Sequence, residues 1–158
     1  MKKTLLISKV LPVYSVLSQA KYGQMNDADK IKVWKIARAM KPIADQYDDT
    51  AKDAAEKFKP TVEGFEQKLE KSQMVQQMLR MPNADIKTMP MGIAEYNQFM
   101  TEVMNPYNRL VAKALDEVSK KEVTLEYDGL SEAAFEKLMS SNDWIFEQAV
   151  KLSELMVE

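Results

Sequence analysis

Residues 122–127, with the sequence Glu-Val-Thr-Leu-Glu-Tyr, alternate polar and apolar side chains with a period of two. This alternation is typical of a β-strand that has one buried face. Lys2 to Ile7 forms a second short run of aliphatic and β-branched residues without a helix cap. Because a lone strand leaves its backbone hydrogen-bonding groups unpaired, we expect Lys3–Ile7 to pair with Val123–Tyr127. The pairing can lie within one chain or between two chains.

A helix is expected directly after the first strand, since the apolar residues between Val10 and Ala20 recur at spacings of three and four. Ser8 is its expected N-cap. Pro12 would then lie within the first turn, where a missing N–H is tolerated. Gly23 is expected to stop this helix.

The longest helical pattern runs from Ala28 to Lys59, behind an expected cap at Asp27. Pro42 removes one backbone hydrogen bond from it, which predicts a kink near Ala39–Pro42 or two helices that meet there. The apolar residues step by three and four along one stripe, which faces a core or a partner helix. They are Ile36, Met40, Ile43, Tyr47, Ala51, Ala54 and Phe58.

Helical spacing also covers Thr61 to Arg80 and Gly92 to Lys120, with a second kink expected at Pro106. Met81 to Met91 contains two prolines and is the clearest loop. After the second strand, Ser131 is expected to cap a short helix, and a final helix is expected to open near Asn142 and Asp143.

These elements predict a mainly α fold with a small two-stranded β ribbon, an α+β class. We expect an antiparallel long helical hairpin with short terminal helices. With 158 residues and no internal repeat or flexible linker, residues 1–158 are expected to form a single domain.

The chain contains no histidine, no cysteine and only four glycines. A Ser-His-Asp or Cys-His site therefore cannot be built, and zinc has no typical ligands. Phosphate-binding and dinucleotide-binding loops need more glycines than this sequence supplies in one place. We expect no enzyme activity, no catalytic residues and no cofactor. A carboxylate-dependent hydrolase remains an alternative, because glycoside hydrolysis requires only two carboxylates.

The charge balance gives no sign of a polyanionic partner. The formal net charge is −2, which provides no global attraction to nucleic acid. Five basic residues are expected to spread around one helix instead of forming a stripe, which favours a solvated helix face. A nucleic-acid-associated regulator is the alternative, and it requires these residues to gather on one folded surface. These residues are Lys30, Lys32, Lys35, Arg38 and Lys41.

No apolar run approaches the length of a bilayer span, so no membrane partner is expected. The N-terminal apolar run is broken by Ser8 and Lys9 and lacks a signal-peptide cleavage site. We therefore expect a cytoplasmic protein.

Four aspartates, Asp45, Asp48, Asp49 and Asp53, would share one helix face and could in principle hold a hard cation. One straight helix rarely wraps an ion, and no calcium-loop spacing is present. We expect a solvated face and no metal site.

The methionines suggest a partner-binding surface, because flexible and polarisable side chains can repack around different partners. Met81, Met89 and Met91 lie in the expected loop, and Met74 and Met78 precede it at helical spacing. The aromatic side chains, in contrast, are expected mostly in the core. They include Trp34, Tyr47, Tyr96, Phe99, Tyr107, Phe135, Trp144 and Phe146.

The order of elements resembles an uncharacterised family of small proteins encoded by tailed bacteriophages and prophages. A short strand leads into a helix at Val10–Ala20 and a long charged helix around Lys30–Phe58, and a later strand at Val123–Tyr127 leads into short helices. The resemblance spans residues 3–58 and 122–157 and lies in layout and hydrophobic pattern. It implies a phage-borne accessory or assembly protein without known catalytic residues.

Together these observations predict a non-enzymatic protein-interaction or assembly protein of phage or mobile-element origin. It would act through amphipathic helix faces and the Met-rich loop. Its partner would be a protein, with a second copy of the chain, and hence a homo-oligomer, as one option.

Overall fold

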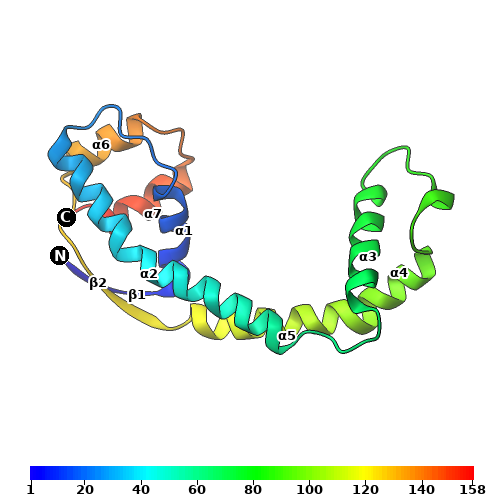
Figure 1. Ribbon diagram of the computed structural model, residues 1–158. Coiled ribbons are helices and arrows are strands. Elements are labelled where there is room, and N and C mark those ends of the chain that lie inside the picture. The colour runs from blue at the N-terminus through cyan, green and yellow to red at the C-terminus, as the bar shows by residue number, and fades with distance from the viewer. The chain divides into compact units, whose positions relative to one another are not determined.

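The computed structural model describes all residues from 1 to 158 (Figure 1). The fold is mainly helical with one two-stranded antiparallel sheet, as the sequence predicts. The chain divides into two compact units. The first combines Met1–Thr50 with Asp116–Glu158, and the second contains Ala51–Leu115.

The β ribbon of the first unit joins β1 (Lys2–Leu6) to β2 (Glu122–Glu126). Thr4 lies opposite Thr124, with their hydroxyl oxygens 3.0 Å apart. The expected pairing is therefore confirmed, and it lies within one chain.

Helix α1 (Ile7–Leu17) begins directly where β1 ends. The expected cap is wrong, because Leu6 occupies the N-cap position and makes no side-chain cap bond. The amide of Ile7 donates instead to the carbonyl of Lys121 at 2.9 Å, so the ribbon supplies the missing partner. Pro12 consequently lies beyond the first turn, and the helix stops at Leu17, well before Gly23.

Helix α2 (Asp27–Lys57) runs through Pro42 as one element, so the option of two helices is wrong. Its cap is also one residue earlier than expected. The Asn26 side-chain oxygen accepts a hydrogen bond from the Asp29 amide at 2.8 Å, the arrangement of an N-cap.

The C-terminal part of the first unit contains α6 (Glu132–Ser140) and α7 (Phe146–Met156). Ser131 caps α6, as expected, by accepting from the Ala134 amide at 3.2 Å. α7 does not open near Asn142, where it is expected, but begins at Phe146. The side chain of Asn142 is hydrogen-bonded to the backbone of Lys21 instead.

The core of the first unit is built from α1, the N-terminal part of α2, β2, α6 and α7. Its most deeply buried side chains include Val10, Leu17, Val33, Ile36, Met40, Leu130, Leu138, Leu152 and Met156. Both chain ends reach the segment Tyr127–Leu130. The Met1 ammonium donates to the Tyr127 carbonyl at 2.7 Å, and the Glu158 amide donates to the Leu130 carbonyl at 3.1 Å.

The second unit contains α3 (Phe65–Leu79), a 3₁₀ turn (Ile86–Thr88), α4 (Ile93–Phe99) and the larger part of α5 (Asn105–Ser119). α2 and α5 each contain residues of both units. The expected loop at Met81–Met91 is present apart from the 3₁₀ turn.

The helix expected over Gly92–Lys120 is interrupted before Pro106 by a π-helical turn, Met100–Met104. The Asn105 amide donates to the Met100 carbonyl, five residues earlier. A proline has no N–H and its ring crowds the carbonyl four residues before it. The wider turn is one of the recognised ways in which a helix accommodates such an interruption.

An aromatic cluster forms the core of the second unit. The Phe65 ring centroid lies 6.2 Å from that of Phe99 and 6.4 Å from that of Tyr107. Met104 completes the buried cluster. The Tyr107 hydroxyl donates to the Ala55 carbonyl at 3.1 Å, which ties α5 to the end of α2.

Candidate functional site

The methionines predicted to bind a partner differ widely in exposure. Met74 and Met81 are 50% and 61% exposed, and Met78 and Met89 are half-buried. Met91, however, is only 3% exposed. Met91 is therefore packed within the unit and is not accessible to a partner in this conformation.

The remaining methionines lie in one stretch, residues 74–89, which we call the Met segment. Met74 and Met78 are one helical turn apart on α3, and Met81 follows one turn later. With 100° per residue, Met74 lies on the side of α3 opposite to the buried Phe65. Met78 lies only about 60° from the fully buried Val75 and is accordingly half-buried. Ile86, 63% exposed, extends the apolar character into the loop.

The four aspartates of α2 form no metal-type cluster. All four are exposed, and the Asp45 carboxylate is bound to the Lys41 ammonium at 2.6 Å. No group of three or more acidic side chains is placed to hold a cation. Their arrangement is that of a solvated helix face.

Three of the five basic residues of α2 already have partners. Lys30 lies 3.6 Å from the carboxylate of Asp27, and Lys41 is paired with Asp45. The Lys32 ammonium lies 3.5 Å from the Gly129 carbonyl. Exposed ion pairs of this kind are weak, and Lys35 and Arg38 have no carboxylate within 4.0 Å. Phosphate binding by this helix therefore stays an alternative.

Two of the aromatic side chains that are expected mostly in the core are exposed. Trp34 on α2 is 53% exposed, and Phe146, the first residue of α7, is 85% exposed. The Arg38 guanidinium carbon lies 5.1 Å from the Trp34 ring centroid, within the range of a cation–π contact.

Trp34 and Arg38 line a cleft of about 430 Å³ between α1 and α2, which we call the aromatic cleft. Sequence reasoning missed this site because its residues come from two helices that are separated by a loop. The signal available was the turn-by-turn spacing of Trp34, Arg38 and Lys41 on one helix. The other main lining residues are Tyr14, Leu17 and Tyr22.

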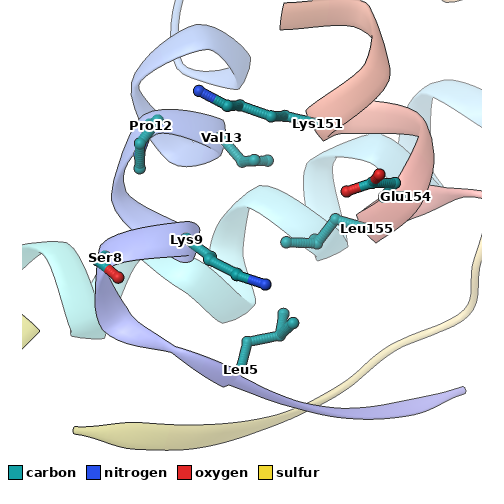
Figure 2. A pocket seen from close by; sticks show the side chains of 8 residues that line it. All are labelled: Leu5, Ser8, Lys9, Pro12, Val13, Lys151, Glu154 and Leu155. Atoms are coloured by element: carbon teal, nitrogen blue, oxygen red, sulfur yellow. The ribbon is translucent and has the colours of Figure 1, made fainter. Parts of the chain in front are cut away.

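A second, smaller hollow of about 230 Å³ lies between α1 and α7 (Figure 2). Lys151 reaches from α7 toward Pro12 on α1, while Glu154 also approaches the hollow from α7 (Figure 2). The Lys151 ammonium is held by Glu147 at 2.6 Å. The hollow is below the usual volume range for small-molecule sites, about 300–1,000 Å³. Of the ionic side chains that line it, Lys9, Lys151 and Glu154, only Lys151 is in an ion pair.

The strongest shift of a titratable group has a structural cause. Burial raises the pKa of Tyr127 to about 12, and its hydroxyl donates to the Leu155 carbonyl. The hydrogen bond from Lys59 lowers the pKa of Glu66, and that from Lys151 lowers the pKa of Glu147. Both carboxylates are exposed ion-pair partners.

Comparison of the chain with protein-family models, curated proteins and solved structures finds no match. None of the helices combines the length and the apolar composition that a bilayer crossing requires.

Proposed function

We propose that this chain is a non-enzymatic protein-interaction or assembly protein of phage or mobile-element origin, located in the cytoplasm. The observation that carries the proposal is the exposure of Met74, Met81 and Ile86 within the Met segment. Exposed apolar side chains concentrated in one short stretch are typical of a surface that a partner covers.

The spacing within the Met segment favours a helical partner. Met74 and Met78 lie one turn apart on α3, and Met81 follows just beyond the end of this helix. Together they supply apolar side chains that can pack between the apolar residues of a second helix. Burying these side chains would contribute about 25 cal/mol for each Å² of apolar surface removed from water. The occupant that we propose is an amphipathic helix of another protein, with a second copy of this chain as the alternative.

The chemistry of the structure supports a non-enzymatic role. Residues whose pKa is strongly perturbed are often catalytic, but here the largest shift belongs to Tyr127, whose hydroxyl closes a backbone hydrogen bond. The chain also has no imidazole or thiol to serve as a base or nucleophile.

Phage or mobile-element origin is supported by the resemblance in element order over residues 3–58 and 122–157. The genes beside the coding sequence test it. We expect neighbouring genes that encode phage head, tail or packaging proteins. A coding sequence that is flanked only by housekeeping genes would contradict the proposed origin.

A photo-crosslinking residue at position 81 tests the partner surface in cells, with the same residue at Gln73 as the control. Gln73 is exposed on α3 beside Met74. We expect a protein crosslinked through position 81 and absent at position 73. The purified partner should then bind the wild-type chain directly.

Binding of that partner should weaken at least about 10-fold in Met74→Glu and in Met81→Glu, because each places a charge in an apolar contact. Gln73→Glu adds the same charge at a neighbouring exposed site and should leave the affinity unchanged. Equal binding by all three variants would show that the Met segment is not the interface.

A further inference from the structure

The most exposed large apolar side chain of the chain is Phe146, at the start of α7. Its neighbour Ile145 is 63% exposed. A phenylalanine that folding leaves in water gains most from burial against another surface, since an aromatic side chain buries roughly 150–250 Å².

The aromatic cleft is the complementary feature of the same unit. Leu17 is buried at the cleft, Tyr14 and Tyr22 are half-buried, and Trp34 is exposed. Tryptophan, tyrosine and arginine are the residues most enriched among those that dominate binding energy at protein interfaces. The cleft therefore has the composition of a socket for an apolar side chain.

The charges of the two features also match. Arg38 at the cleft has no carboxylate within 4.0 Å, and Asp143, three residues before Phe146, has no cation within that distance. A carboxylate that arrives with the phenylalanine ring can bind the planar guanidinium through two hydrogen bonds.

We propose that two copies of this chain associate by placing Phe146 of each copy in the aromatic cleft of the other, with Asp143 facing Arg38. Each copy gives one ring and receives one, so the assembly closes as a symmetric dimer. A second copy is the occupant that we favour over nucleic acid, because it brings an exposed aromatic ring together with a carboxylate that has no cation within 4.0 Å. This contact is separate from the Met segment and does not depend on it.

Analytical ultracentrifugation of the full chain at several protein concentrations tests the proposal. The wild-type chain should form a dimer as its concentration rises. Phe146→Ser and Trp34→Ala should each weaken dimerisation at least about 30-fold, the effect of losing one dominant contact residue. Leu110→Ser removes an apolar side chain that is 46% exposed on α5, in the other unit, and should leave the dimer unchanged.

Mixing the two defective variants separates a lost contact from a damaged fold. The Phe146→Ser chain keeps an intact cleft, and the Trp34→Ala chain keeps the inserting ring, so the mixture should form a heterodimer through one contact. Trp34→Phe, which keeps an aromatic ring, should retain part of the affinity if Trp34→Ala does not fold.

Trp34 itself supplies a second readout. In a Trp144→Phe background it is the sole tryptophan, and its emission should shift to shorter wavelength as the dimer forms. A monomer at all concentrations, a dimer that survives Phe146→Ser, or a failure of the mixed variants to associate would each overturn the proposal. Salt-sensitive quenching of Trp34 by a 15-nucleotide dT strand, without dimerisation, would assign the cleft to nucleic acid instead.

Discussion

The Tyr127 hydroxyl donates a hydrogen bond to the backbone carbonyl of Leu155. Leu155 lies in the last turn of α7, where helix carbonyls have no partner within the helix. Tyr127 follows β2 directly and its ring is buried. One side chain thus joins the ribbon to the end of the last helix and satisfies a carbonyl that would otherwise lack a partner.

This contact predicts a loss of stability in alkali. Burial raises the pKa of Tyr127 from 10.0 to about 12, so the unfolded chain releases the phenolic proton first. The full stability is present below pH 10 and falls as the pH rises toward 12, by up to about 2–3 kcal/mol. Urea unfolding measured from pH 8 to 12 should show this loss.

Tyr127→Phe should lower stability at neutral pH by roughly 1 kcal/mol, through loss of the hydrogen bond to Leu155. It should also flatten the decline above pH 10. Tyr96→Phe, at a half-exposed ring, is the control and should leave the decline in place. If the stability of Tyr127→Phe declined above pH 10 as steeply as that of the wild-type chain, the decline would come from titratable groups other than Tyr127.

Among the four glycines, Gly64 is the one whose backbone conformation disfavours a side chain. It precedes α3 with a φ of 67°, a left-handed conformation that costs a residue with a Cβ about 1–2 kcal/mol. Gly64→Ala should therefore lower the free energy of unfolding by about that amount, with Gly64→Asn intermediate.

Gly92 provides the matched control, because it has a φ of −64° and no atom within 4 Å of an added Cβ. Gly92→Ala should change the free energy of unfolding by no more than about 0.5 kcal/mol, because the loss of a glycine at the N-cap of α4 offsets the restriction of the unfolded chain. Chemical denaturation of both variants measures the contrast. Equal changes in the free energy of unfolding at the two positions would show that the backbone conformation does not determine the cost of the substitution.

The ribbon and the helices could be predicted from sequence because each has a period of its own. The alternation of polar and apolar residues indicated the strand at 122–127, and apolar residues at spacings of three and four indicated α2. The start of α1 could not be predicted, since the partner of its first amide lies in a distant part of the chain. The start of α7, in contrast, carries a local signal, the glutamine three residues after its N-cap. The Lys121 carbonyl receives the first amide of α1, and the Gln148 side chain accepts from the Ile145 amide at 3.2 Å.

Exposure was the harder property to predict. Composition identifies Trp34, Phe146 and Met91 as apolar, but the surface each one meets depends on segments distant in sequence. Met91 is buried from within a loop, whereas the Phe146 ring is left in water at the start of a helix. The aromatic cleft was missed for the same reason.

The contrast between the methionines gives a further prediction. Met91→Ala removes a buried side chain and should destabilise the chain by about 2–5 kcal/mol. Met81→Ala removes an exposed one and should change stability by no more than about 0.5 kcal/mol. Thermal unfolding of both variants tests this, and a large loss in Met81→Ala would mean that Met81 is packed in solution.

The two compact units should unfold together, as the sequence prediction of a single domain requires. α2 and α5 each carry residues of both units, and helix formation is cooperative along a continuous segment. Differential scanning calorimetry should therefore show one transition. Phe99→Ala, in the core of the second unit, and Leu138→Ala, in the core of the first, should each lower its midpoint. A cost of about 3 kcal/mol corresponds to a shift of roughly 6–12 °C for a chain of this size. Two transitions, of which each variant moves only one, would instead show that the units are separate domains.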